Sequence, residues 1–457
     1  MNSYGRRKIF TDATEITIEN VVDEVRKATL IHEANRAEIN KLYDYYRGKT
    51  DILKKEKLVR PEINHKINEN RAYEAVNFHK GYAFGEPIQY VRRENSCSEI
   101  SDELIASDIN SLNGFMSVAG KAACDRRLAE WLYISGSSYR LTLPNKNWTE
   151  GSGEPPFEIH SLEPGQTFVA YSSAIGHKPM FSVHMVERED KQRVFGVYTE
   201  NSYFEFTEFG TPVETKNPLG LNPIVEYPSG TSRLGVFEIA IPLMDALDEL
   251  QSNRLDDIVQ HVNSILAVMG AELDKDGYDK LAEWKMMFLP DGTDAKYISA
   301  AMSQNDLQTL KSDICQAIWE ICGVPNRNGG SSTSDTGQAV ELRDGWSAAE
   351  TRAKDVETVF KESEMQFLRI VLRIMRDTVG TNLNLMDIEP YFTRRNYENI
   401  ASKSQVLVAM LNNPWIHPEV AYATCGMFPD PQSAYLQGMA WHDSQQPKQP
   451  VQPETEE

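Results

Sequence analysis

The feature that most constrains this chain is a long amphipathic helical pattern near its middle. The pattern covers residues 237–269, which predicts a helix of about 50 Å at a rise of 1.5 Å per residue. Glu238, Asp245, Glu249 and Asp256 fall on one face of it, and aliphatic side chains occupy the opposite face. An acidic face is by default a solvated one. A helix of this length still needs partners along its apolar face, and self-association into a bundle or a ring would supply them.

A second helix is predicted over residues 303–322, after a compact insert at 271–302. Gly323 and Pro325 end this helix. The insert contains the strand-like run WKMMFLP at 284–290, and four of its side chains are too apolar to stay open to water: Trp284, Met286, Met287 and Phe288. This run forms either a small local core or a surface for pairing with another subunit.

The segment NRNGGSSTSDTG at 326–337 is rich in Gly and Ser and predicts a mobile loop. A very long helical pattern follows over about residues 338–379, with Gly345 as its expected kink. The last globular stretch, 383–441, contains one clear helix at 404–411, and residues 443–457 predict a disordered acidic tail.

The first half of the chain predicts an α+β unit. Helical patterns cover residues 21–47, 68–82 and 107–136. Between 137 and 228, apolar and polar residues alternate between Gly and Pro turns, which is typical of strands. We therefore expect an α+β fold that is mostly helical, and the 457 residues suggest about three domains as a soft prior.

The charge balance limits the ways in which this chain can meet nucleic acid. It has 67 Asp and Glu against 47 Lys and Arg, a net charge of −20. An acidic surface repels phosphate, so a DNA partner would not be gripped by a basic patch. The five cysteines form no CxxC pair, and no run of about 18 apolar residues could span a membrane. The N-terminus lacks the apolar core of a secretory signal, so we expect the chain in the cytosol, with no membrane partner.

The motifs of common enzymes are missing. RGKT at 47–50 lacks the earlier Gly of a phosphate-binding loop, because Tyr43 occupies that position. The nine histidines include no HExxH and no i, i+4 pair, so no metal site is predicted. The chain also has no GxSxG nucleophile elbow. An enzyme is unsupported, and no cofactor is expected.

Four segments of this sequence are similar to segments that occur in the same order in one protein family. The first two are YYRGKTDIL at 45–53 with INHKINENRAYEAVNFHKGYAFGEPIQY at 63–90, and NPLGLNPIVEYPSGTSRLGVFEIAIPLMDALDELQSNRLDD at 217–257. The third is WEICGVPN at 319–326 with TGQAVEL at 336–342, and the fourth is PYFTRRN at 390–396. Together they resemble the portal proteins of tailed bacteriophages, of the kind found in long-tailed phages of Gram-positive hosts.

The resemblance implies a division of the chain into the parts of a portal subunit. Residues 1–235 and the long helix at 338–380 would form the wing, 236–270 and 303–325 the two stem helices, 271–302 the clip and 381–442 the crown. The loop at 326–337 would be the tunnel loop of the DNA channel, with these candidate residues: Arg327, Asn328, Gly329, Gly330, Ser331, Ser332, Thr333, Ser334 and Asp335.

The resemblance also implies partners and a location. Portal proteins form a ring, dodecameric in the capsid, at one capsid vertex, and double-stranded DNA passes through its channel. The terminase large subunit, a head-to-tail adaptor, the major capsid protein and scaffolding proteins would be the other partners. The chain would be assembled in the host cytoplasm and remain in the virion, and ATP hydrolysis would belong to the terminase.

Physical chemistry supports an acidic conduit, because each Lys or Arg contact with phosphate is a bond that sliding DNA would have to break. The four acidic residues of the first long helix would repeat around the ring, facing either into the channel or outward. Two alternatives remain open at this point: a cytoplasmic α+β enzyme with a helical oligomerisation arm, and another minor capsid protein.

Overall fold

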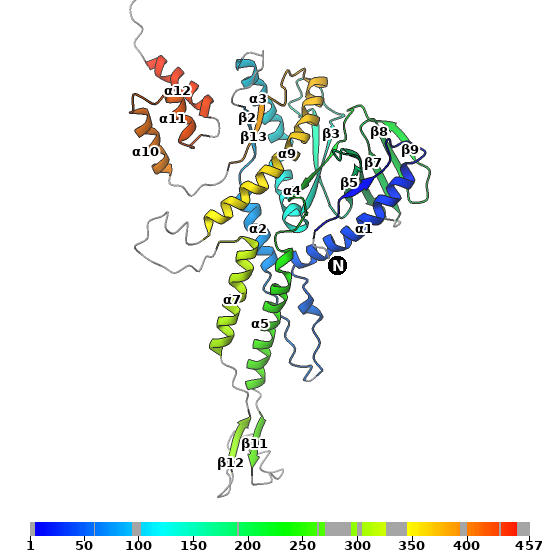
Figure 1. Cartoon of the computed structure of the whole chain (residues 1–457), viewed down its shortest axis with the longest axis vertical. Coiled ribbons are helices and arrows are strands. Elements are labelled where there is room, and N and C mark those ends of the chain that lie inside the picture. The colour runs from blue at the N-terminus through cyan, green and yellow to red at the C-terminus, as the bar shows by residue number, and fades with distance from the viewer. Residues whose placement is uncertain are drawn as a thin grey trace, which may run out of the picture. The chain divides into compact units, whose positions relative to one another are not determined.

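The computed structural model describes residues 5–58, 60–93, 102–189, 192–262, 265–269, 294–298, 304–325, 345–393, 400–428 and 431–445. The chain divides into two compact units, each built from separate stretches. Unit 1 comprises residues 1–42, 76–236 and 349–457, and unit 2 comprises residues 43–75 and 237–348. Figure 1 shows the elements of both units. More of the described residues lie in helices than in strands, and the fold is α+β, as predicted.

The larger sheet of unit 1 has six strands in the order β1-β5-β6-β7-β8-β9. Their bounds are Ile9–Thr11, Thr167–Ser172, Pro179–Glu187, Arg193–Tyr198, Ser202–Thr207 and Val213–Lys216. β1 joins β5 in parallel, and the later neighbours are antiparallel. Helix α1 (Val21–Tyr46) places Val21, Val25 and Ala28 in one core with the apolar residues of this sheet.

The smaller sheet of unit 1 has the order β10-β3-β4, with bounds Ile224–Pro228, Ser137–Pro144 and Phe157–Leu162. Helix α4 (Lys121–Ser135) lies against it. Helix α3 (Asp102–Val118) lies against β2 (Gln89–Arg92), which pairs with β13 (Ile388–Tyr391). The long helix α9 (Trp346–Thr378) buries an apolar stripe that includes Phe360 and Phe367.

The last part of unit 1 is a small helical cluster. It consists of α10 (Ile400–Leu411), α11 (Pro418–Thr424) and α12 (Pro431–Gln445). Leu407, Ala421 and Cys425 form its buried centre. Most of the cluster falls within the stretch that the resemblance assigns to the crown. Helix α12 continues to Gln445, so residues 443–445 are helical although the sequence predicted them as part of the disordered tail.

Unit 2 is built around two helices, α5 (Ile241–Val262) and α7 (Gln304–Cys322), which lie side by side (Figure 1). Short 3-10 turns lie at Asp51–Lys54 (η1) and Glu238–Ala240 (η2). Strands β11 (Ile265–Met269) and β12 (Asp294–Ile298), which follow α5 and precede α7 in the chain, pair antiparallel. Helix α2 (Arg71–Ala83) starts in this unit and continues into unit 1.

Three predicted helices differ from the structure, each for a local reason. The first long helix ends at Val262, and residues 265–269 form β11, because the apolar run ILAVM has no polar face to show its period. The helix predicted at 107–136 is two helices, separated at Gly120, whose φ of 69° is left-handed. Gly345 precedes α9 and does not kink it, because its φ of 82° is incompatible with a helix.

Candidate functional site

The acidic side of α5 is covered by an earlier stretch of the same unit. Residues 47–70, which we call the clasp, run along α5, for most of their length on the side away from α7 (Figure 1). Near its end, Glu69 reaches α7. Among the described residues of the clasp, Ile52 and Ile63 are the buried hydrophobic ones, so its apolar anchoring is small. Polar bonds to α5 therefore carry most of its attachment.

Asp256 is the centre of this attachment. Its side chain is 0% exposed and forms ion pairs with Lys57 and, at 3.6 Å, with Lys55. The backbone N–H of His65 donates to Asp256 Oδ1 at 2.8 Å, and His65 Nδ1 lies 2.8 Å from the same oxygen. Burial alone would raise the pKa of Asp256, but the bonds from Lys57 and His65 outweigh it and lower the pKa to about 2.

A second group of bonds holds the two ends of the clasp. Thr50 Oγ1 donates to Asp248 Oδ2 at 2.9 Å, and the backbone N–H of Glu69 donates to Asp248 Oδ1 at 2.8 Å. The Tyr45 hydroxyl, just before the clasp, donates to Asp245 at 2.9 Å. Burial raises the pKa of Asp248, although its two donors partly offset that rise. The carboxylates of α5 thus serve as acceptors for the chain's own clasp.

Glu69 links the clasp to both long helices. It accepts from Gln251 of α5 and pairs with Lys311 of α7. Burial raises the pKa of Glu69, but the bond and charge of Lys311 outweigh it, so the pKa lies below its usual value. The neighbouring Arg71 lies 5.4 Å from the ring of Trp319 on α7. The clasp, α5 and α7 therefore form one bonded layer.

The structure gives the four acidic residues of the first long helix different surroundings. Asp256 and Glu238 are buried, at 0% and 5% exposure, and Asp245 is half-buried against Tyr45. Glu249 is exposed. The prediction of one open acidic face is therefore wrong for Asp256 and Glu238, because their own chain covers them. For Asp256 the sequence gives no sign of this cover, because Lys57 and His65 are nearly 200 positions away.

The other predicted site residues lie outside the described residues. These are the tunnel-loop candidates at 327–335 and the clip candidates Trp284, Met286, Met287 and Phe288. Their proposed roles rest on the sequence.

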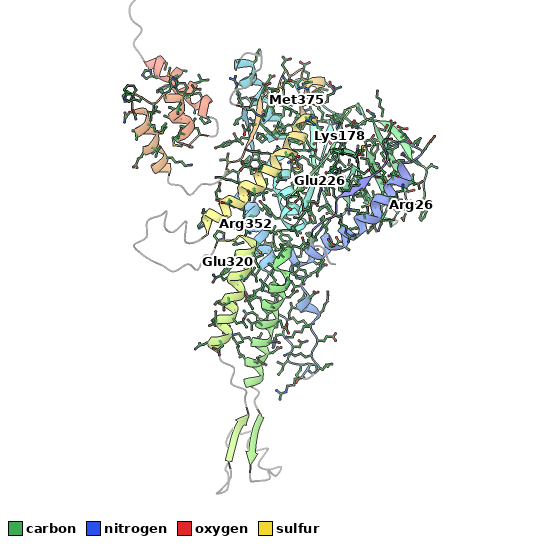
Figure 2. All side chains as sticks on the ribbon, viewed as in Figure 1. Arg26, Lys178, Glu226, Glu320, Arg352 and Met375 are labelled. Carbon is green, nitrogen blue, oxygen red and sulfur yellow. The ribbon has the colours of Figure 1, made fainter. Side chains whose placement is uncertain are left out.

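An acidic surface that the sequence analysis did not single out lies on α7. Asp306, Asp313 and Glu320 are spaced seven apart and are exposed, and Figure 2 labels Glu320 on this helix. Residues seven apart share one face of a helix. The buried residues Cys315, Ile318 and Cys322 lie on the other side of α7. The seven-residue spacing was the available signal for this face.

Unit 1 contains a fully buried charge network that joins α4, β3 and α9. Arg140 and Glu364 are each 0% exposed, and Lys121 and Asp125 are almost as deeply buried. Glu364 is bonded by Lys121 and Arg140 at 2.8 and 2.9 Å, and by the hydroxyls of two tyrosines, Tyr90 and Tyr227. Lys121 and Arg140 also pair with Asp125. The two positive charges balance the two negative ones.

The pKa values of the two buried carboxylates shift in opposite directions in this network. Burial raises the pKa of Glu364, but the charges of Arg140 and Lys121 outweigh it and lower the pKa to about 2. For Asp125, burial dominates and the pKa is raised. The four charged side chains are at most 4% exposed, and their mutual bonds hold α4, β3 and α9 together.

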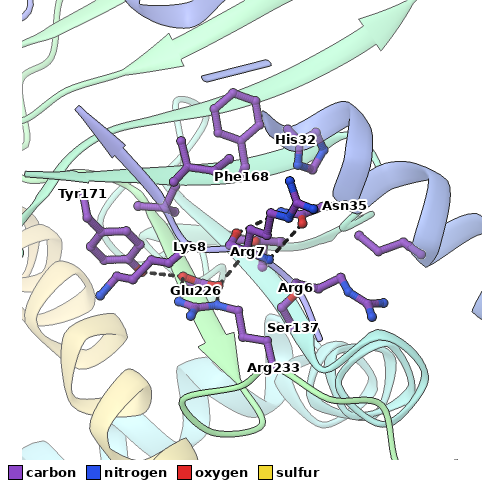
Figure 3. Close-up of a pocket in the computed structure, with 14 residues that line it drawn as sticks. Arg6, Arg7, Lys8, His32, Asn35, Ser137, Phe168, Tyr171, Glu226 and Arg233 are labelled. Carbon is purple, nitrogen blue, oxygen red and sulfur yellow. Dashed lines mark hydrogen bonds and ion pairs between the residues drawn. The ribbon is translucent and has the colours of Figure 1, made fainter. Parts of the chain in front are cut away.

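Figure 3 shows a narrow cavity in unit 1 beside β1. The cavity has a volume of about 10 Å³, which fits a single water molecule. Asn35 accepts from the backbone N–H of Arg7 and donates to its C=O, each at 2.9 Å, and Arg233 pairs with Glu226 at 2.7 Å. The cavity is too small for a cofactor, so these residues fix the N-terminal strand.

Within the described ranges, no group of three or more His, Cys, Asp or Glu is placed to hold a metal ion. No described helix is long and apolar enough to cross a membrane.

Comparison with known proteins supplies the class of this chain. Residues 27–438 match the family model "Phage portal protein, SPP1 Gp6-like", so the protein is a phage portal protein. Since the match covers most of the 457 residues, the chain belongs to the SPP1 Gp6-like portal family. The resemblance inferred from the sequence is thereby confirmed.

Two solved structures match this chain over most of its length. "Neck of empty GTA particle computed with C6 symmetry" has a TM-score of 0.45 at 13% identity, covering 78% of this chain and 90% of that one. "Virion of native gene transfer agent (GTA) particle" has a TM-score of 0.44 at 14% identity, with the same coverage. None of the curated proteins compared matches this chain.

Proposed function

We propose that this chain forms a ring at one capsid vertex, through which double-stranded DNA enters the head during packaging and leaves it during ejection. The observation that carries the proposal is the portal family match over residues 27–438. The protein would act without catalysis, as a structural conduit, and ATP hydrolysis would belong to the terminase large subunit. Its locations would be the host cytoplasm during assembly and the vertex of the virion afterwards.

We assign the parts of the portal subunit as the sequence resemblance implies. Unit 2 contains the two proposed stem helices, and the β11–β12 pairing lies between them in the chain, at and beside the proposed clip. The apolar run at 284–290 would dock the terminase and later the head-to-tail adaptor. The loop at 326–337 would contact the moving DNA, and contacts with the major capsid and scaffolding proteins would hold the ring in the shell.

We expect the purified protein to form rings with a central hole wide enough for duplex DNA, because its family consists of portal proteins. Negative-stain electron microscopy followed by class averaging would measure this. A dodecamer is expected in the capsid, and ring number in isolation would be counted from end views. Monomers or dimers at all concentrations, also in the presence of the capsid and scaffolding proteins, would contradict the conduit.

We expect Glu249→Lys to slow DNA packaging, because Glu249 is the exposed member of the predicted acidic face of α5. A lysine there would add about one phosphate contact per subunit, and each such contact makes binding to DNA stronger and more salt-dependent. Packaging would be followed as DNase-protected DNA, at two salt concentrations. Glu249→Gln is the matched control, which removes the negative charge and adds no positive one. Equal packaging rates for the Lys and Gln variants would show that Glu249 does not line the channel.

A further inference from the structure

We propose that the clasp of one copy of this chain docks on the outer face of α7 of a second copy, so that neighbours in the ring meet head to tail. The proposal rests on the proposed portal function, because a closed ring gives every copy two neighbours. The proposal names the two surfaces that meet and the charges that attract them. It also states that each copy uses one surface toward one neighbour and the other surface toward the other neighbour.

The clasp presents a basic surface with an apolar tip. Leu58 is 101% exposed and Leu53 is 44% exposed. Residues 49–66 carry six basic and three acidic residues, a net charge of +3 in a chain of net charge −20. Lys55 and Lys57 pair with Asp256 of their own chain. Of the other bases, Lys49 pairs with Asp44 at 3.5 Å, Lys54 pairs with Asp51 at 2.7 Å, and Lys66 donates to the C=O of Leu53 at 2.7 Å. Together with Arg60 they still leave the stretch with its net positive charge.

The outer face of α7 has the complementary character. Asp306, Asp313 and Glu320 are exposed along it, and Leu310 beside them is 48% exposed. Lys311 is the single basic residue of α7, and it pairs with Glu69 of its own chain. The outer face of α7 is thus acidic and has an apolar residue at its side. It therefore complements the clasp, which is basic and has an apolar tip.

Apart from Glu69, which pairs with Lys311, the clasp and α7 with its outer face lie on opposite sides of α5. Ser252 and Asp256 bond the clasp, whereas Arg254 between them donates to Gln308 of α7 at 3.1 Å. Neighbouring positions two residues apart point to nearly opposite sides of a helix. Figure 1 shows the same arrangement, with the clasp on one side of α5 and α7 on the other.

Complementary surfaces on opposite sides of one subunit produce a heterologous contact. Such a contact repeats from copy to copy and closes into a ring when the rotation allows it, whereas a contact of one surface with itself ends at a dimer. The position of the clasp therefore fits a ring and does not fit a simple dimer.

Cysteine cross-linking tests the proposal on the full-length chain. We would make Leu58→Cys and Asp313→Cys as single variants and treat them, separately and mixed, with a short bis-maleimide. Four native cysteines, Cys124, Cys315, Cys322 and Cys425, are buried, and the unsubstituted protein measures the background. We expect a cross-linked dimer in the mixture, and a ladder that extends beyond the dimer when both changes are in one chain.

A matched control pairs Leu58→Cys with Ala246→Cys, because Ala246 is exposed on α5 but belongs to neither proposed surface. We expect its cross-linked yield to be at least about tenfold lower. Equal yields from the two pairs would overturn the proposal, and so would a Leu58/Asp313 product that stops at the dimer.

Charge reversal gives a second, independent readout. Asp306→Lys with Asp313→Lys places like charges opposite the clasp, which we expect to lower the yield of rings by about tenfold at low salt. Adding Lys54→Glu and Lys66→Glu to the same chain should restore it. If rings of the unsubstituted protein are seen but neither change affects them, the proposed contact is wrong and the portal ring stands. If the unsubstituted protein forms no rings, also in the presence of the capsid and scaffolding proteins, the proposed function itself fails.

Discussion

Replacing Glu364 by Gln will destabilise unit 1 by about 3–5 kcal/mol, the cost expected when one partner is removed from a buried ion network. Glu364 is 0% exposed and accepts from four donors: Lys121, Arg140, Tyr90 and Tyr227. The substitution leaves the two buried cations with Asp125 as their sole carboxylate partner in this network. Chemical denaturation followed by tryptophan fluorescence would measure the loss.

Two matched variants keep this first prediction specific. Glu362 lies on the same helix as Glu364 but is exposed. We therefore expect Glu362→Gln to change the free energy of unfolding by no more than about 0.5 kcal/mol. Adding Lys121→Met to Glu364→Gln removes one buried charge of each sign, so the double variant should be more stable than Glu364→Gln alone. A loss below about 1 kcal/mol for Glu364→Gln would show that the network does not hold α9 in place.

Replacing Asp256 by Asn will release the clasp from α5, at a cost of about 2 kcal/mol for the charge-assisted bonds that it weakens. The amide keeps the size of the carboxylate but offers an NH2 group to Lys57, which needs an acceptor. The clasp is rich in Lys, so limited digestion with trypsin reports its release directly. We expect cleavage within residues 54–60 to become about tenfold faster.

The control for this second prediction is Asp257→Asn, the neighbouring carboxylate on another side of α5, which should leave the cleavage rate unchanged. Equal cleavage rates for Asp256→Asn and the unsubstituted protein would contradict the role of Asp256. Charge reversal with Asp256→Lys would place three ammonium groups together and should prevent the clasp from docking at all. A packaging defect in that variant would therefore report a loss of structure and not a contact with DNA.

The same bonds predict how the clasp depends on pH. The pKa of Asp256 is lowered from 3.8 to about 2 in the folded protein. A lowered carboxyl pKa stabilises the fold above the unfolded value, and this stabilisation is lost as the pH falls through the folded value. The contribution of Asp256 should thus be complete above about pH 4 and disappear toward pH 2, and Asp256→Asn should lack this dependence. Hydrogen exchange of the clasp amides, measured across this range, would check the sign.

The sequence predicts well those parts of the fold whose pattern is local. The helices α1, α5 and α7, the β-rich stretch at 137–228 and the α+β class follow from periodicity and from Gly and Pro positions. The family could also be predicted, because several segments resemble it in the right order. The errors are local too: the apolar run at 265–269 has no period, and single glycines decide where α3 ends and α9 begins.

The polar architecture could not be predicted, because its partners are distant in the sequence. The amphipathic pattern of α5 shows that Asp256 is polar, but not that Lys57 and His65 cover it. Likewise, nothing near Arg140 indicates that Glu364 will meet it in the core. A charged face on a helix is the same pattern whether it meets water, DNA or its own chain, and the contact alone distinguishes these cases.

The discontinuous construction of unit 1 has a consequence for the timing of synthesis. Arg140 and its partner Glu364 are 224 positions apart. At a ribosomal speed of about 5–20 residues per second, Arg140 waits roughly 10–45 s for that carboxylate to be translated. Until then, the core between α4 and β3 holds two cations and one carboxylate. A nascent chain therefore cannot complete this network of unit 1 before Glu364 has been translated.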